Sequence, residues 1–218
     1  MLQLYVDSAD RAVAEPLLAT GLFRGLATNP LLWERAGVRV EHLAELYAWA
    51  AAAGAREVFL QTWGGDEQAL WDTAQRLLEI GPQVVVKVPA TPAGATVAAR
   101  LAAAGHPVLL TAVYAARQAL VAAAAGMTYL APYVGRMGDA GRDGLAEVIT
   151  MQQLLDATAS PTRILAASLR TVDEVVRLAT AGVGCFALSP TVATALLTDP
   201  LTEQATADFE RAARAVGG

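Results

Sequence analysis

Side chains that bind metals or form disulfides are scarce in this sequence. Its 218 residues include two histidines and one cysteine, Cys185, so the chain cannot form an internal disulfide. His42 falls in a predicted helix and His106 precedes a predicted strand, so the sequence offers no plausible zinc ligand set. We therefore expect no metal cofactor, and a single cysteine is typical of a reducing compartment.

Positive charge and long hydrophobic runs are also in short supply. The chain carries 16 basic and 21 acidic residues, a net charge of -5, whereas a nucleic-acid surface needs clustered Lys and Arg. The longest apolar runs, such as 107–116, are too short to span a bilayer. The start MLQLYVDSAD lacks the basic and apolar regions of a signal peptide. These features predict a cytoplasmic protein with neither nucleic-acid nor membrane partners.

Short β-type segments alternate with helical segments along the whole chain. Segments such as VVVKVP and VLLTAV are almost wholly apolar, which is typical of parallel strands covered on both faces. The expected strands are Gln3–Asp7, Gly25–Thr28, Glu57–Gln61, Val84–Pro89, Val108–Val113, Tyr129–Val134, Arg163–Ser168 and Cys185–Ser189.

Helix start and stop signals lie between these strands. Thr91 followed by Pro92 indicates a helix N-terminus, and Thr171 with Glu174 forms a capping box. Eight such units without a linker predict one (β/α)₈ barrel domain over residues 1–218. An open doubly wound sheet is the alternative, but no GxGxxG motif follows the first strand.

An additional helix is expected at the C-terminus, over 201–218. Its apolar positions Leu201, Ala205, Phe209, Ala212 and Val216 share one face. That face could close the bottom of the barrel or dock on a neighbouring subunit, and the pattern does not choose between them.

The chain contains fifteen arginines but a single lysine, and that lysine stands in the most apolar strand. Burial of an ammonium is costly unless the group is paired or neutral. Arginine would serve as a simple buried charge, but only an amine can lose its proton and attack a ketone carbonyl. We therefore interpret Lys87 as a Schiff-base nucleophile, with a structural ion pair as the alternative.

Further polar residues follow the other predicted strands, where barrels place their chemistry. They are Asp7, Asn29, Gln61, Thr111, Tyr133, Arg136, Ser168 and Arg170. Taken singly, Asp7 and Asn29 could be helix caps, Gln61 and Thr111 could satisfy backbone groups, and the arginines could be surface charges. Around a buried lysine they predict an active site.

Two kinds of chemistry can be assigned within this set. The scarcity of histidine leaves Tyr133 and Asp7 as candidate acid/base groups. Arg136, Ser168 and Arg170 follow late strands, where guanidinium and hydroxyl groups suit a phosphate monoester.

The chain resembles the small transaldolase-like barrels, and most closely the fructose-6-phosphate aldolases, through the motifs LYVDSAD, ATNP, VVVKVPAT, LLTAVY, APYVGR and LAASLRT. The resemblance implies that Lys87 is the Schiff-base lysine and that Asp7 and Asn29 contact the donor hydroxyls. It also implies that Gln61, Thr111 and Tyr133 hold a water and move protons. Arg136 and Ser168 would then bind the acceptor phosphate.

Two positions of the resemblance favour the aldolase branch over transaldolase. Transaldolases have a glutamate where this chain has Gln61 and commonly a phenylalanine at the place of Tyr133. Ala27 stands where the branch is expected to have threonine, and Trp63 is also unusual, so donor preference is open. The resemblance further implies a homo-oligomeric ring or double ring joined through the C-terminal helix.

The sequence therefore predicts a cofactor-free aldolase that cleaves fructose 6-phosphate to dihydroxyacetone and glyceraldehyde 3-phosphate. One alternative is a transaldolase that transfers the dihydroxyacetone unit between sugar phosphates. The other is a barrel that binds a sugar phosphate without chemistry.

Overall fold

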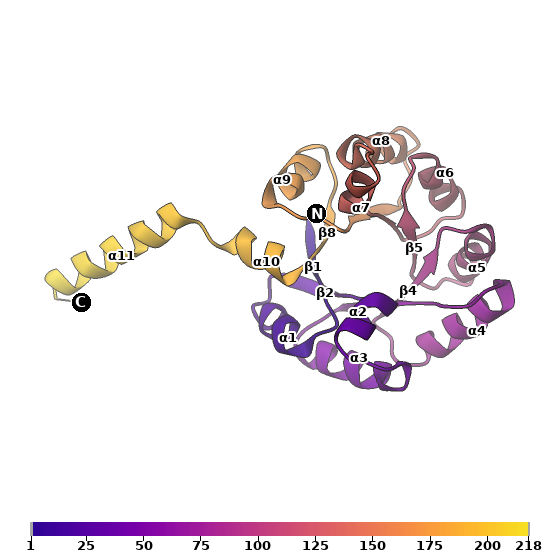
Figure 1. Cartoon of the computed structure of the whole chain (residues 1–218), viewed down its shortest axis with the longest axis horizontal. Helices are drawn as coiled ribbons and strands as arrows, with labels where there is room; N and C mark the ends of the chain where they lie inside the picture. Colours follow the sequence, from indigo (N-terminus) through magenta and orange to yellow (C-terminus); the bar gives the residue numbers. More distant parts are fainter. Residues whose placement is uncertain (1, 218) are drawn as a thin grey trace.

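The computed structural model, which describes residues 2–217, is a closed barrel of eight parallel strands ringed by helices (Figure 1). Each strand pairs with the next in sequence, and β8 closes the ring on β1. The strands are β1 Gln3–Asp7, β2 Phe23–Ala27, β3 Glu57–Gln61, β4 Val84–Pro89, β5 Val108–Val113, β6 Tyr129–Pro132, β7 Arg163–Ala166 and β8 Cys185–Leu188. The predicted (β/α)₈ barrel is confirmed, and the open-sheet alternative is wrong.

Four predicted strands have the observed bounds, and four differ at their ends. β2 is shifted toward the N-terminus and ends at Ala27, because Asn29 already caps the next helix. β6 and β8 end before Tyr133 and Ser189, which are the N-cap residues of the helices that follow. β7 ends at Ala166, and Ser168 adopts φ +58°, a left-handed conformation that no strand accommodates.

The helices other than α11 surround the barrel, and the predicted caps form. Thr91 Oγ1 accepts from Gly94 N, and Thr171 and Glu174 make a reciprocal capping box. No helix within residues 2–217 is both long and apolar enough to cross a membrane. The helices are α1 Arg11–Ala19, α2 Pro30–Arg35, α3 Leu43–Ala52, α4 Glu67–Leu78, α5 Pro92–Ala103, α6 Arg117–Ala124, α7 Val134–Asp139, α8 Gly144–Ala157, α9 Val172–Thr180, α10 Pro190–Leu197 and α11 Pro200–Ala215, with a 3₁₀ turn at Val40–His42.

Strand alternation divides the apolar side chains into two cores. Val86 and Val88 of β4 belong to the outer core between strands and helices, whereas Val85 belongs to the inner core of the barrel. Because neighbouring positions on a strand point to opposite faces, Lys87 points inward with Val85. Above this inner core, at the C-terminal end of the barrel, the inward-pointing side chains include polar residues.

The C-terminal helix α11 extends away from the barrel (Figure 1). None of its residues is buried: Leu201 and Phe209 are 80% and 72% exposed, and Val216, which follows the helix, is 87% exposed. The alternative in which this helix closes the bottom of its own barrel is therefore wrong. Docking on a neighbouring subunit stays a prediction.

The N-terminal end of the barrel is filled by a polar cluster around Glu57. Tyr5 and Tyr129 donate their hydroxyls to the Glu57 carboxylate, and Arg24 Nε lies 3.0 Å from Glu57 Oε2. Burial opposes ionisation of Glu57, but the hydrogen bonds from Arg24 and Tyr5 outweigh it. The pKa of this carboxyl therefore lies below its ordinary value of 4.5.

Glu57→Gln is expected to lower the free energy of unfolding by about 2 kcal/mol at pH 7, because it removes one partner of a largely buried charged network. A carboxylate with a lowered folded-state pKa stabilises the fold above its unfolded-state pKa, and this contribution is lost as pH falls through the folded value. The gap between wild type and variant should therefore shrink below pH 4.5.

Urea unfolding at several pH values measures this effect. Glu41→Gln is a matched control, since Glu41 makes an exposed ion pair with Arg39. Equal losses in both variants would contradict a stabilising role for the Glu57 cluster.

Candidate active site

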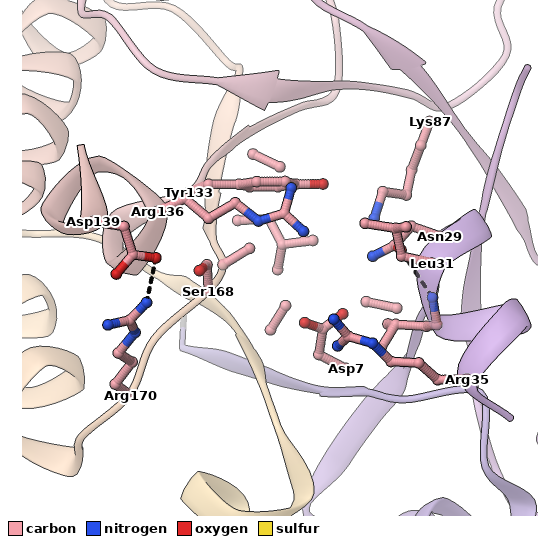
Figure 2. Close-up of a pocket in the computed structure, with 16 residues that line it drawn as sticks. Asp7, Asn29, Leu31, Arg35, Lys87, Tyr133, Arg136, Asp139, Ser168 and Arg170 are labelled. Carbon is pink, nitrogen blue, oxygen red and sulfur yellow. Dashed lines mark hydrogen bonds and ion pairs between the residues drawn. The ribbon is translucent and has the colours of Figure 1, made fainter.

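A cavity of about 240 Å³ opens at the C-terminal ends of the strands (Figure 2). Four basic and two acidic side chains line it, although the whole chain carries a net charge of -5. The excess of basic groups suits an anionic ligand. Its polar lining consists of Asp7, Asn29, Arg35, Lys87, Tyr133, Arg136, Asp139, Ser168 and Arg170.

Lys87 lies at the inner end of this cavity and is only 4% exposed. Its Nζ donates a hydrogen bond to the carbonyl oxygen of Thr28 at 2.8 Å. No ion pair links it to a carboxylate among residues 2–217, so the structural ion-pair alternative finds no partner there. The amine is held in place at the floor of a cavity that a small ketone can enter.

The Thr28 carbonyl, which accepts the hydrogen bond from Lys87, is held in position by the turn after β2. Thr28 Oγ1 donates to the carbonyl of Phe59 at 2.8 Å and accepts from the indole Nε1 of Trp33 at 2.9 Å. Trp63, singled out from the sequence, packs edge-on against Trp33 at 6.0 Å and does not line the cavity. Trp63 therefore supports the turn from outside, while Ala27 lies in the cavity wall itself.

Asp7 and Asn29 reach the cavity from the ends of β1 and β2. Burial raises the pKa of Asp7, and the nearby positive charges of Lys87 and Arg136 lower it, with a net rise. Asn29 also caps α2, because its Oδ1 accepts from Leu32 N at 3.1 Å. The capping interpretation of Asn29 and its place in the cavity are thus both correct.

Tyr133 stands on the wall opposite Lys87, and its hydroxyl is 2.9 Å from Thr111 Oγ1. The end of β5 has a bulge, where Ala112 adopts φ +56° and the β5–β6 register shifts. Just after this bulge, the Tyr114 ring contacts the Tyr133 ring edge-on, with the ring centroids 5.8 Å apart. The guanidinium of Arg136 lies 4.9 Å from the Tyr133 ring centroid. The phenol is thereby held by two side-chain contacts with its ring and by a hydrogen bond at its oxygen.

Ser168 and Arg170 lie beyond β7, beside the start of α7. Gly135 N donates to Ser168 O at 2.8 Å, and a Cβ at Gly135 would come within 2.5 Å of that oxygen. Glycine therefore lets the Arg136 and Ser168 segments approach each other. Arg170 lines the cavity but is paired with Asp139 at 2.5 Å, turned away from the cavity centre (Figure 2).

Not every predicted residue lines the cavity. Thr111 is fully buried behind the wall and reaches the site through Tyr133. Gln61 pairs with Lys87 in the β3–β4 register and shares the inward face with Phe59, but it is not part of the cavity lining. The sequence interpretation missed Arg35 and Asp139, both of which lie on helices that follow the strand ends.

Known proteins with similar sequences cover almost the whole chain. Residues 4–216 match the family described as Transaldolase/Fructose-6-phosphate aldolase. A probable transaldolase of Phenylobacterium zucineum (strain HLK1) is 36% identical over 208 residues, which cover 95% of this chain and 94% of the relative. A probable transaldolase of Hyphomonas neptunium (strain ATCC 15444) is 32% identical over 216 residues, with 99% of both chains covered.

Solved structures with similar folds are more distant in sequence. A mutant mandelate oxidase carrying a monooxide FMN adduct superposes with a TM-score of 0.58 at 18% identity, covering 88% of this chain and 66% of the oxidase. A mutant flavocytochrome b2 with bound pyruvate gives 0.59 at 13% identity, covering 88% of this chain and 57% of the other. These likenesses concern the barrel fold alone.

Proposed function

Because this chain belongs to the Transaldolase/Fructose-6-phosphate aldolase family, we propose that it is a Schiff-base aldolase that reversibly cleaves fructose 6-phosphate to dihydroxyacetone and glyceraldehyde 3-phosphate. The observation that carries the proposal is the only lysine of the chain, buried at the floor of a basic cavity and facing a hydrogen-bonded tyrosine. A sugar phosphate is both the anionic ligand and the carbonyl compound that this arrangement suits.

Lys87 supplies the nucleophile of the reaction. Its Nζ adds to the C2 carbonyl of the open-chain sugar, and loss of water leaves a protonated imine. Asp7 and Asn29, which line the cavity, bind the hydroxyls next to that carbon in this scheme. Lys87 gives up its hydrogen bond to the Thr28 carbonyl as the new bond forms.

Carbon–carbon cleavage uses the imine as an electron sink. The C4 hydroxyl loses its proton, the C3–C4 bond breaks, and glyceraldehyde 3-phosphate leaves with C4 as its aldehyde carbon. The bonding pair moves into the protonated imine and produces an enamine. Tyr133, oriented by Thr111, moves protons to and from the reacting atoms. Protonation at C3 and addition of water then release dihydroxyacetone.

Arg136 and Ser168 bind the phosphate at the outer part of the cavity. A guanidinium and a hydroxyl together give charge-assisted hydrogen bonds to phosphate oxygens. No cofactor takes part in this scheme.

Transaldolase is the second candidate, because the relatives carry the name probable transaldolase. A transaldolase would keep the enamine on Lys87 until an acceptor aldose arrived. Gln61 favours the aldolase, since an amide cannot carry a proton as a carboxylate can, which leaves this work to Tyr133.

Release of glyceraldehyde 3-phosphate from fructose 6-phosphate alone separates the two candidates. We expect steady release over many enzyme equivalents, because the enamine is protonated and dihydroxyacetone departs. A burst of about one equivalent that resumes only with erythrose 4-phosphate would identify a transaldolase instead. A protein that only binds the sugar would show neither release nor a borohydride-trapped adduct on Lys87.

A further inference from the structure

The phosphate side of the cavity is short of available positive charge. A phosphate monoester carries about -1.5 to -2 charges at pH 7, which one guanidinium does not balance. Arg136, whose guanidinium lies over the Tyr133 ring, can bind the phosphate. Arg170 already pairs with the Asp139 carboxylate. A second cation for the phosphate must therefore come from elsewhere or from rupture of that pair.

Arg35 is a guanidinium in the right place. It is the last residue of α2, the helix that Asn29 caps, and it lines the same cavity. Its side chain is exposed, and within residues 2–217 no hydrogen bond or ion pair engages it. Figure 2 shows Arg35 and Arg136 extending into the cavity from opposite walls, with Arg35 on the side away from Ser168.

Depth in the cavity decides which substrate group Arg35 meets. Lys87 is buried at the floor, so the sugar carbon bonded to it lies there too, and C1 lies next to that carbon. A phosphate on C1 would crowd the buried carboxyl of Asp7. The phosphate on C6 is at the far end of the sugar chain and reaches the rim, where the exposed Arg35 lies.

We propose that Arg35 is a specificity-determining residue that binds the substrate phosphate from the wall opposite Arg136. The assignment rests on the proposed function and deepens it. Bound between the two guanidinium groups, the phosphate has its charge balanced without breaking the Arg170–Asp139 pair. Arg35 also covers the bound sugar at the cavity mouth.

Arg35→Gln tests the proposal in the synthesis direction, with dihydroxyacetone as donor. We expect KM for glyceraldehyde 3-phosphate to rise roughly tenfold, the effect of losing one charge-assisted contact. For unphosphorylated glyceraldehyde, kcat/KM should stay within about twofold, and Arg35→Lys should restore part of the phosphate preference. Arg39→Gln is the control, since Arg39 pairs with Glu41 and lines no part of this cavity.

Two results would overturn the assignment. Unchanged KM for the phosphorylated acceptor would exclude a phosphate contact, and an equal loss with both acceptors would show that Arg35 shapes the cavity regardless of charge. Calorimetric titration of fructose 6-phosphate and fructose into Lys87→Met protein, with and without Arg35→Gln, measures the same preference without turnover. The phosphate contact is thus tested even if the wild-type protein fails to cleave the sugar.

Discussion

Lys87→Met is expected to reduce cleavage of fructose 6-phosphate by at least about a thousandfold while leaving the barrel folded. Methionine fills a similar volume in the inner core and leaves only the Thr28 carbonyl without its hydrogen bond. The nucleophile is lost, however, and no other side chain of this sequence offers an amine. The defect should therefore appear in kcat, with the circular dichroism spectrum and the urea midpoint close to wild type.

Lys87→Arg separates the role of the amine from the role of the charge. Arginine keeps a positive charge in the cavity but stays protonated, so it cannot form the imine, and we expect it to be as inactive as methionine. Borohydride reduction with dihydroxyacetone should add the mass of one reduced donor unit to wild type alone. Because Lys87 is the only lysine, peptide mapping places that adduct without ambiguity. Turnover by either variant would refute the Schiff-base mechanism.

The barrel could be predicted because its strands are unusually apolar and its helices carry clear caps. A strand such as VVVKVP is consistent with burial on both faces, and the Thr91 and Thr171 caps set the starts of α5 and α9. Strand ends were less predictable. The sequence pattern predicts that Tyr133 and Ser168 continue their strands. Tyr133 instead begins a helix, and Ser168 adopts a left-handed backbone conformation that the sequence does not reveal.

The site was predicted to the extent that it lies on strands. Alternation along β1 and β4 gives the inward direction of Asp7 and Lys87 without knowledge of the fold. Arg35 and Asp139 were missed because they lie at the far ends of short helices, where direction depends on how each helix packs. A signal for Arg35 existed: Asn29 followed by Pro30 marks the start of α2, and Leu32 and Arg35 follow at helical spacing.

The ion pair between Arg170 and Asp139 could not be predicted from the sequence either. Arg170 belongs to a motif that suggests phosphate binding, but its partner Asp139 is 31 residues away in α7. Only the packing of α7 beside the segment after β7 shows that this guanidinium is already engaged.

Tyr133→Phe is expected to lower kcat for fructose 6-phosphate cleavage by roughly a hundredfold, the usual contribution of a positioned acid or base. Phenylalanine keeps the ring that packs against Tyr114 and Arg136, so the cavity retains its shape. The hydroxyl that meets Thr111 Oγ1 is lost, and with it the group that moves protons. Borohydride trapping on Lys87 should persist, since the nucleophile is untouched.

Tyr114→Phe is the matched control, because it removes a neighbouring phenol hydroxyl that does not line the cavity. Its kcat should stay within about twofold of wild type. If Tyr133→Phe instead retains full cleavage activity, proton transfer must pass through the buried Asp7, whose raised pKa suits it to carry a proton. If a Tyr133→Phe protein still forms the enamine on Lys87, and that enamine then leaves only by adding to an acceptor aldose, without release of dihydroxyacetone, this phenol alone separates aldolase from transaldolase chemistry.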